Sequence, residues 1–267
     1  MVSRTSKLAR AYAESGGLAQ IFSSKVADYV ASRPDYPAAL FDVLVERARL
    51  SSTASVVDDG AGPGLLSQGL LERGVPVVGV EPNAEMRAAA TALLSGYRSF
   101  SCLPGSAEQL PLTASSADLV CAAHAFHWFD LQKTREEFLR VLNPSGQVAL
   151  IWNDRLLTDP LHQGLNRIFE RFGGAKRDAL IEHENRRGLA EFFEDTGVAH
   201  RTFAHEHAIT DTALQSLVIS RSYMPTPDSL EATRVREATA DLCASLGCGD
   251  TIIVRYVTHL YLGRPRA

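Results

Sequence analysis

Short apolar runs alternate with amphipathic stretches through the first 153 residues of the chain. The apolar runs at 54–57, 75–80, 97–103, 117–123 and 147–152 predict strands, because they are too short for buried helices. Apolar residues recur at helical spacing in 37–49, in the segment after residue 64, in 83–94, where Asn83 can cap the helix, and in 131–142. This alternation predicts a parallel sheet with helices on both faces and ligands beyond the carboxyl ends of its strands.

The remaining segments carry weaker patterns. A helix is predicted over 17–32 and ends at the two prolines of 33–37, while 143–146 carries a stop signal for the helix before it. Further helices are predicted at 160–172, at 186–196 and in pieces over 212–246, with a loosely alternating strand at 198–209. The β-branched and aromatic residues of 251–262 predict a last strand at an antiparallel edge. No linker or internal repeat interrupts the chain, so we expect one domain.

A glycine-rich turn follows the first of these strands. Gly60, Gly62 and Gly64 alternate, so the backbone can turn sharply and approach a ligand with no side chain in the way. Glu81 ends the next strand, where a carboxylate can accept hydrogen bonds from two ribose hydroxyls. The pattern predicts a site for a cofactor built on adenosine; the alternative is a tight turn without a ligand.

Composition excludes several classes of function. The net charge of −4 gives no basic footprint for nucleic acid, and no apolar run reaches the roughly 18 residues of a membrane span. The four cysteines are scattered, which favours a reducing, cytoplasmic compartment, although basic residues near the N-terminus faintly resemble a transit peptide. His205 and His207 share one side of a strand, but without a third ligand we expect a solvated face and no metal.

Six short motifs occur in order between residues 22 and 153. They are Tyr29 with 33–37, the turn at 56–64, 80–83 with Met86, 105–108 with 110–111, 125–128, and 151–153. Together they resemble the class I S-adenosylmethionine (SAM)-dependent methyltransferases, and more narrowly the small-molecule branch that includes trans-aconitate methyltransferase-like (methyltransferase type 11) proteins. Each motif alone is weak evidence for this family, but six of them in this order are specific for it.

The resemblance implies a Rossmann-like, doubly wound α/β fold. Its seven-stranded sheet would be mostly parallel with an antiparallel last strand. It also divides the single domain of residues 1–267 into an N-terminal lid (1–36), a cofactor-binding core (37–153), and acceptor-covering insertions with the final strands (154–267). The cofactor would be S-adenosyl-L-methionine.

The same resemblance implies the cofactor-binding residues. Asp58 and the backbone of Gly60, Ala61 and Gly62 would lie near the methionine part of SAM. Glu81 would hold the ribose hydroxyls, Ala107 and Glu108 would flank the adenine, and His124 would lie close to the sulfonium. The predicted set is completed by Tyr29, Arg33, Pro82, Met86 and Ala123.

Two residues depart from the family pattern. Pro63 stands where Thr is usual, which removes a backbone donor and a hydroxyl, and His124 stands where Gln or Ser is common. These departures motivate an alternative, a SAM-fold protein with lost or altered catalysis that serves as a binding module or a cyclase-like enzyme. A nicotinamide-dependent oxidoreductase is disfavoured, because its G-x-G-x-x-G pattern would need Gly where Leu65 stands.

Methyl transfer from a sulfonium is an in-line displacement, so the protein mainly positions donor and acceptor. His124 and His127 are the candidate bases for an acceptor that must lose a proton, and their spacing would face them the same way in a helix. The alternative for His127 is packing beside Trp128. Arg33 can bind the carboxylate of SAM or of an acidic acceptor, and a surface salt bridge is the alternative.

The predicted acceptor-binding residues are Trp128, Trp152, Asn153, Ser220 and Tyr223. The segment 220–223 lies in the late helical insertion that usually covers the acceptor, and a solvated helix face is the alternative. We expect a small-molecule acceptor, methylated on a carboxylate or hydroxyl oxygen. We further expect a monomer or homodimer that binds neither nucleic acid nor membranes.

Overall fold

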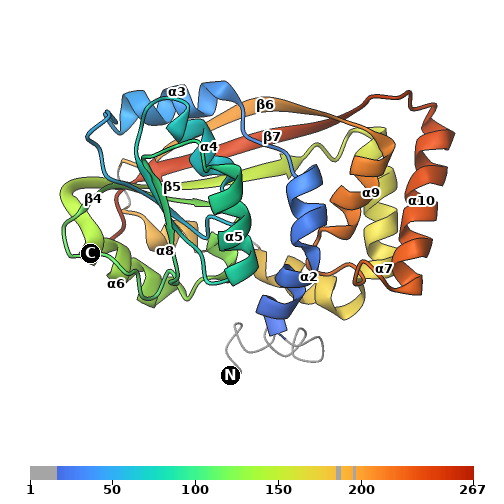
Figure 1. Cartoon of the computed structure of the whole chain (residues 1–267), viewed down its shortest axis with the longest axis horizontal. Coiled ribbons are helices and arrows are strands. Elements are labelled where there is room, and N and C mark those ends of the chain that lie inside the picture. The colour runs from blue at the N-terminus through green and yellow to red at the C-terminus, as the bar shows by residue number, and fades with distance from the viewer. Residues whose placement is uncertain (1–16, 185–187, 195–196) are drawn as a thin grey trace. The chain divides into compact units, whose positions relative to one another are not determined.

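The computed structural model describes residues 17–184, 188–194 and 197–267 (Figure 1). The chain forms two compact units. The core unit comprises residues 35–154, 186–205 and 257–267, and the helical unit comprises residues 1–34, 155–185 and 206–256. The lid at 1–36, the cofactor-binding core at 37–153 and the acceptor-covering part at 154–267 remain predictions.

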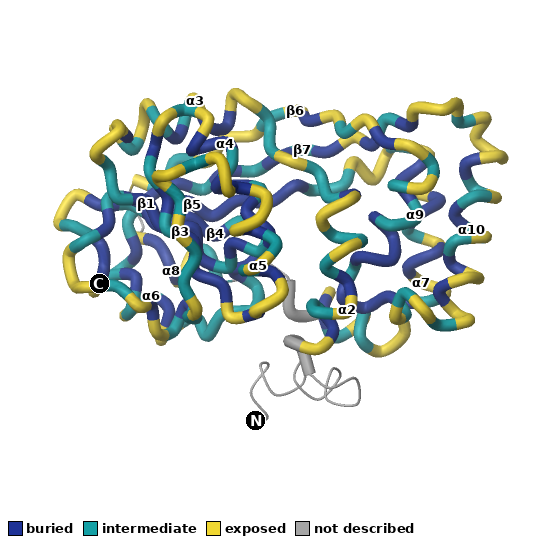
Figure 2. The backbone as a smooth tube through the Cα atoms, viewed as in Figure 1, coloured by how far each residue is buried: buried dark blue, intermediate teal, exposed yellow. Residues whose placement is uncertain are grey.

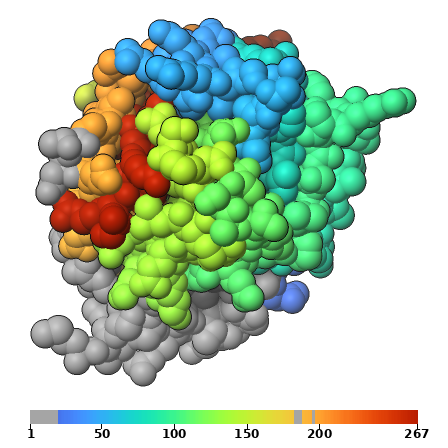
Figure 3. All heavy atoms as spheres, turned by 90° about the vertical axis from the view of Figure 1, so that its left-hand side faces the viewer, coloured from blue at the N-terminus to red at the C-terminus, as the bar shows by residue number. Residues whose placement is uncertain are grey.

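Seven strands form one sheet in the order β3-β2-β1-β4-β5-β7-β6. Their bounds are β1 Val56–Asp59, β2 Val77–Val80, β3 Phe100–Leu103, β4 Ala117–Ala123, β5 Leu142–Arg155, β6 Ala199–Ile209 and β7 Ile252–Gly263. The first five strands pair in parallel, and the last strands are antiparallel. In Figure 3 the red end of β7 lies between orange β6 and the yellow-green segment that contains β5, in agreement with this order. The predicted Rossmann-like fold is confirmed.

Helices cover both faces of the sheet within the core unit. One face carries α3 (Ala38–Arg47) and α4 (Leu65–Leu71), and the other carries η1 (Phe126–Trp128), α6 (Leu131–Val141) and α8 (Leu189–Phe192). Neighbouring residues of β1 point to opposite faces, so Val56 packs with the first set of helices and Val57 with the second. Figure 2 shows the resulting buried strands at the centre of this unit.

Local signals explain where the helices of the core unit begin. Gly64 adopts a left-handed conformation (φ 89°) directly before α4. Asn83 caps α5 (Ala84–Leu93) as predicted, because its Oδ1 accepts the Met86 N–H at 2.9 Å. Asp130 caps α6 by accepting the Lys133 N–H. These caps fix the direction in which each strand-to-helix connection leaves the sheet.

The helical unit contains four of the described helices: α2 Gly17–Ser32, α7 Pro160–Glu184, α9 Asp211–Ile219 and α10 Leu230–Leu246. Helix α2 packs on α9, and α10 packs on both α7 and α9. Gly174 interrupts α7 with a non-helical conformation. No helix in the described part of the chain is long and apolar enough to cross a membrane.

Two predicted elements differ clearly in extent from those of the structure. Helix α6 ends at Val141, as the stop signal at 143–146 predicts, but β5 begins at Leu142 instead of residue 147. Arg264 donates to the carbonyl oxygens of Asn143 and Gly146 in this added part of the strand. The helix predicted at 186–196 shrinks to α8, since Phe193 instead bridges to Pro265; parts of the predicted range lie outside the described residues.

Candidate cofactor site and active site

The glycine turn after β1 is folded tightly against the end of β2. The amides of Gly60 and Ala61 both donate to the Val80 carbonyl oxygen, at 2.8 and 3.1 Å. Gly60 has a φ of +70°, and a Cβ atom there would lie 2.4 Å from Ala125 Cβ. Gly62 also has a positive φ, but nothing lies within 4 Å of its Cβ position. The turn therefore requires glycine at position 60 for two separate reasons, backbone conformation and close packing.

Glu81 is fixed in this turn by two backbone amides. Its Oε2 accepts the Gly62 N–H at 2.9 Å and its Oε1 accepts the Asn83 N–H at 2.8 Å. Burial raises the pKa of this carboxyl, and the two amide hydrogen bonds oppose the shift. Each carboxylate oxygen can accept more than one hydrogen bond, so Glu81 is held in place while retaining capacity for a diol.

Asp58 lies at the end of β1 and is buried. Its Oδ2 accepts the Ser67 hydroxyl at 2.7 Å, whereas its Oδ1 has no hydrogen-bond partner among the described residues. Burial raises the pKa of Asp58 to about 6. A buried carboxylate oxygen without a partner is costly, and an ammonium group of a ligand would satisfy it.

Asp59 was not among the predicted site residues. Both of its carboxylate oxygens are buried without a hydrogen-bond partner in the described structure. Burial raises the pKa of Asp59 well above its ordinary value, and the charges of Glu108 and Asp58 add to the shift. The sequence offered one signal, a second consecutive acid where the run before it is apolar.

The loop after β3 carries the two residues predicted to flank adenine. Ala107 is buried, and the Oε1 of Glu108 accepts the Asp130 N–H at 2.9 Å, which ties the loop to the start of α6. Pro82 and Ser106 help to line a pocket of about 500 Å³ beside this loop. Met86, also predicted, is buried in the first turn of α5.

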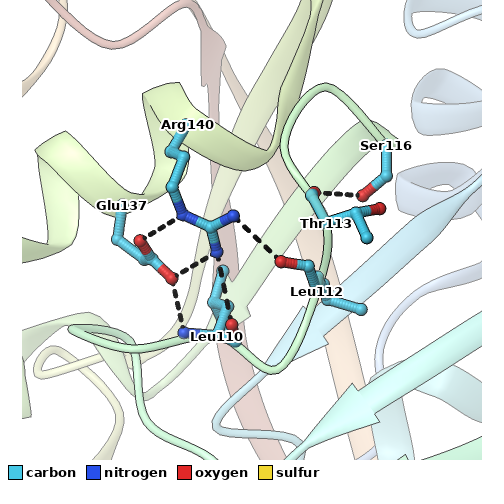
Figure 4. Close-up of polar contacts among 6 residues, drawn as sticks. All are labelled: Leu110, Leu112, Thr113, Ser116, Glu137 and Arg140. Atoms are coloured by element: carbon cyan, nitrogen blue, oxygen red, sulfur yellow. Dashed lines mark hydrogen bonds and ion pairs between the residues drawn. The ribbon is translucent and has the colours of Figure 1, made fainter.

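An ion pair on α6 clamps the far end of the same loop (Figure 4). Arg140 Nε and Nη2 each lie 2.7 Å from a carboxylate oxygen of Glu137. The same guanidinium donates to the carbonyl oxygens of Leu110 and Leu112, and Glu137 accepts the Leu110 N–H at 2.7 Å. The hydrogen bond from Arg140 is the main reason that the pKa of Glu137 is lowered.

His124 follows Ala123 at the end of β4 in a left-handed conformation (φ 52°). Its Nε2 accepts the Asn153 N–H at 2.7 Å. The helix η1 begins only at Phe126, so His124 and His127 do not share a helix, and the condition under which they would face the same way is not met. The His127 ring lies 4.8 Å from the Trp128 ring, as in the packing alternative.

The end of β5 is largely committed to packing and to structural hydrogen bonds. Trp152 is buried, with its ring edge-on to those of Phe126 and Tyr261. The Asn153 amide donates to the Asp35 carbonyl oxygen at 3.0 Å and accepts the Thr258 hydroxyl at 2.6 Å. The predicted acceptor-binding roles of Trp128, Trp152 and Asn153 remain predictions.

Four predicted residues belong to the helical unit. Arg33 lies over the Tyr29 ring at 4.5 Å, and it donates from Nε to the Ser220 hydroxyl at 2.9 Å. Ser220 and Tyr223 are buried, so the alternative of a solvated helix face is wrong. Burial lowers the pKa of Arg33. The structure thus groups Tyr29 and Arg33 with the predicted acceptor residues of the same unit.

The two histidines of β6 are also less exposed than expected. His205 is buried and lies 3.1 Å from Asp35, while His207 Nε2 is 2.9 Å from the Ser32 carbonyl oxygen. The expectation of a solvated strand face is therefore wrong for His205. No group of three or more metal-binding side chains occurs among the residues that the structure describes.

Comparisons with known proteins identify the family. A model of the methyltransferase domain matches residues 57–150. A methyltransferase of Mycobacterium tuberculosis is 35% identical over 240 residues, which cover 89% of this chain and 92% of that protein. The chain belongs to the class I SAM-dependent methyltransferases. This chain is also 32% identical over 152 residues to a methyltransferase-like protein of Schizosaccharomyces pombe. The match covers 57% of this chain and 58% of that relative.

A solved structure shares the fold of the methyltransferase. It is described as a type II methyltransferase from Anaeromyxobacter dehalogenans, with a TM-score of 0.65 and 22% identity over 87% of this chain and 97% of that one. The cofactor of the family is S-adenosyl-L-methionine. The glycine turn offers backbone approach to this group. Asp58 Oδ1, which has no hydrogen-bond partner among the described residues, offers a site for an ammonium, and the fixed Glu81 carboxylate offers acceptors for a diol, so the residues fit the cofactor.

Proposed function

We propose that this methyltransferase transfers the SAM methyl group to an oxygen of a small-molecule acceptor, a carboxylate or a hydroxyl. The binding of SAM in this proposal rests on one observation: the carboxylates of Asp58 and Glu81 lie at strand ends beside the glycine turn. Bound SAM supplies an electrophilic methyl group on a sulfonium. The task of the protein is then to hold donor and acceptor in line and to exclude water.

The proposed roles follow the chemistry of each group. Asp58 would take the amino group of the methionine part, with the backbone of Gly60–Gly62 alongside it. Glu81 would take the ribose hydroxyls, and Ala107 with Glu108 would flank the adenine. The neighbours proposed for the cofactor are Pro82, Met86, Ala123, His124, Tyr29 and Arg33; those proposed for the acceptor are Trp128, Trp152, Asn153, Ser220 and Tyr223.

The choice of a small acceptor is supported by charge and by one relative. The net charge of −4 is unfavourable for a nucleic-acid substrate. A malonyl-[acyl-carrier protein] O-methyltransferase of Erwinia billingiae is 30% identical over 158 residues, covering 59% of this chain and 53% of that protein. A relative is thus named for O-methylation of a malonyl group, which is consistent with an oxygen acceptor.

The state of His124 favours a carboxylate acceptor over a hydroxyl. Because its Nε2 accepts the Asn153 N–H, the neutral ring carries its proton on Nδ1, and the lone pair that a base needs is in use. A hydroxyl acceptor must lose a proton during transfer, whereas a carboxylate is already ionised at neutral pH. His127, packed beside Trp128, is the other proposed base.

The second candidate is a SAM-binding protein with lost or altered catalysis. It is favoured by the buried Pro63, which has no N–H to donate in the turn, and by the engaged ring of His124. The variant Pro63→Thr separates the two. Unchanged or tighter binding of S-adenosylhomocysteine is expected if the turn binds the cofactor in the usual way, and clear weakening would indicate a differently shaped site.

Calorimetry with S-adenosylhomocysteine tests the cofactor site. Glu81→Gln should weaken binding at least tenfold, because an amide nitrogen would face either the Gly62 or the Asn83 N–H. Glu136→Gln, an exposed change on α6, is the matched control and should bind as the natural chain does. No binding by the natural chain at millimolar ligand would overturn the proposal.

Transfer itself is measured with methyl-labelled SAM and a panel of small carboxylic acids and alcohols. A carboxylate product is a methyl ester, whose label is released by mild base, whereas a methyl ether keeps its label. Label transfer to either class supports the proposal. Cofactor binding without transfer to any member of a broad panel would favour the second candidate.

A further inference from the structure

Helix α10 ends in a compact turn that carries two cysteines. Gly247 has a left-handed conformation (φ 64°, ψ 34°), and its N–H donates to the Ala244 carbonyl oxygen at 3.2 Å. The Cys248 N–H donates to the Cys243 carbonyl oxygen at 3.0 Å. These two hydrogen bonds form a Schellman motif, a common ending for helices, in which the side chains at the positions of Cys243 and Cys248 commonly pack together.

The longer-range of these hydrogen bonds limits the distance between the two cysteines. With standard bond lengths, a hydrogen bond of 3.0 Å keeps the Cα atoms of Cys243 and Cys248 within about 7 Å, and the bend at the carbonyl shortens this distance further. Disulfides usually join Cα atoms that are roughly 4.4–6.8 Å apart. Both residues are free cysteines, so the turn holds two thiols at a separation that a disulfide can bridge.

The two thiols differ in their surroundings. Burial raises the pKa of the Cys243 thiol to about 12, the next largest contribution comes from Cys248, and Asp211 in the first turn of α9 adds to the shift. Figure 1 shows α10 beside α9, on which it packs. Cys243 is 6% exposed, whereas Cys248 is half-buried. A small reagent in solvent can therefore reach Cys248 more readily than its neighbour.

We propose that Cys243 and Cys248 form a site of reversible thiol modification, at which a low-molecular-weight disulfide such as oxidised glutathione produces an intramolecular disulfide. The inference is independent of the proposed function, because neither cysteine is among the residues proposed for the cofactor or the acceptor. Two cysteines that merely fill the end of a helix would pack in the same place, so the reaction itself has to be measured.

The reaction consists of two successive thiol–disulfide exchanges. The Cys248 thiol loses its proton and attacks one sulfur of oxidised glutathione, which releases the first glutathione as a thiol. The Cys243 thiol then loses its proton and attacks Cys248 Sγ, which releases the second glutathione. The protein gives up two protons and two electrons, and oxidised glutathione takes them up. Because the thiolate is the nucleophile, the high pKa of Cys243 makes the second exchange the slower one.

The test uses the reduced full chain in glutathione buffers of defined ratio, followed by alkylation, trypsin and mass spectrometry. Residues 237–255 contain no lysine or arginine before Arg255, so trypsin leaves both cysteines in one peptide. In oxidising buffer we expect this peptide to lose two hydrogen atoms and to take up no alkyl group. The equilibrium constant for closure should be at least tenfold larger in the folded chain than in concentrated urea, because the turn holds the thiols together.

Single substitutions separate the two exchanges. Cys243→Ser should accumulate a mixed disulfide of Cys248 with glutathione, because the second thiol is missing. Cys248→Ser should form no disulfide in the same peptide, and this change at a half-buried position provides the test if Cys243→Ser does not fold. Cys102→Ser is the matched control, since Cys102 is also half-buried but lies in β3, and closure should be unchanged.

The turn itself is tested by Gly247→Ala. Nothing lies within 4 Å of the Cβ position, but alanine disfavours the left-handed conformation, so the closure constant of the folded variant should fall severalfold. The oxidised natural chain should also melt at a higher temperature than the reduced one, because a cross-link that the folded state favours stabilises that state.

Four results would overturn the inference. They are equal closure constants in the folded chain and in urea, a mixed disulfide at Cys248 that persists in the natural chain, loss of closure in Cys102→Ser, and an unchanged closure constant in Gly247→Ala. Failure of the natural chain to bind S-adenosylhomocysteine, measured separately, would count against the proposed function and not against this site.

Discussion

Replacing Gly60 by alanine tests why the cofactor turn is built from glycine. The new Cβ would lie 2.4 Å from Ala125 Cβ, and the residue would have to keep a φ of +70°. The left-handed conformation costs an alanine about 1–2 kcal/mol, and overpacking at a tight contact adds about 1–3 kcal/mol. Gly60→Ala should therefore lower the free energy of unfolding by about 2–5 kcal/mol.

Gly62 provides the matched control in the same turn. Its φ is +54°, but nothing lies within 4 Å of its Cβ position, so Gly62→Ala should lose only the conformational part, about 1–2 kcal/mol. The difference between the two variants then isolates the contact with Ala125. Both free energies are measured by urea unfolding without ligand, and calorimetry with S-adenosylhomocysteine reports whether the turn still binds.

A double variant completes the test. Gly60→Ala combined with Ala125→Gly removes the clashing atom, and the next neighbours of the new Cβ, at 3.7 and 3.8 Å, are at ordinary contact distance. Its stability should exceed the value expected from adding the two single changes. The reasoning would be refuted if Gly60→Ala were no more destabilising than Gly62→Ala, or if the double variant showed no recovery.

Three further predictions concern other buried or bridging groups. Arg140→Met releases the loop after β3 from α6 and should raise the dissociation constant of S-adenosylhomocysteine several-fold; an unchanged constant would show that the clamp does not hold the adenine side. The pKa of Asp59 is higher in the folded protein than in the unfolded chain. At a pH below the pKa of the unfolded chain, Asp59 is protonated in both states and does not destabilise the fold. As the pH rises from there towards the pKa of the folded protein, Asp59 ionises more readily in the unfolded chain and the fold loses stability. Asp59→Asn should therefore gain stability relative to the natural chain between pH 5 and pH 7 in urea titrations, and a pH-independent difference would contradict this. Thr258→Val should lose about 1–2 kcal/mol of unfolding free energy, since Asn153 Oδ1 loses a buried partner, whereas Thr258→Ser should retain it.

Pattern and local chemistry predicted much of the fold. Helix α2 and strand β4 have the predicted bounds, and Asn83 caps α5 as expected, because caps and buried strands depend on neighbouring residues alone. The glycine turn and the position of Glu81 at a strand end were also predicted from the sequence. They indicated a cofactor built on adenosine, since parallel strands bring their carboxyl ends to one edge, and the resemblance of six motifs in order indicated a SAM-dependent methyltransferase.

Other features depended on contacts between distant segments. The periodicity of the sequence could not show that His124 adopts a left-handed conformation and accepts the Asn153 N–H. Nor could it show that both carboxylate oxygens of Asp59 are buried without a hydrogen-bond partner among the described residues. It likewise treated Arg33 as a lone cation. The packing of α2 on α9 brings Arg33 to Ser220, the residue before Arg221.

There is a physical reason why some features could be predicted from the sequence and others depended on the tertiary structure. Secondary structure, caps and the glycine turn are set by interactions over a few residues, so the sequence by itself determined the doubly wound fold and the cofactor turn. Electrostatic surroundings are set by whatever the fold places within several ångströms, regardless of separation along the chain. The tertiary structure alone therefore decided which carboxyl groups are buried.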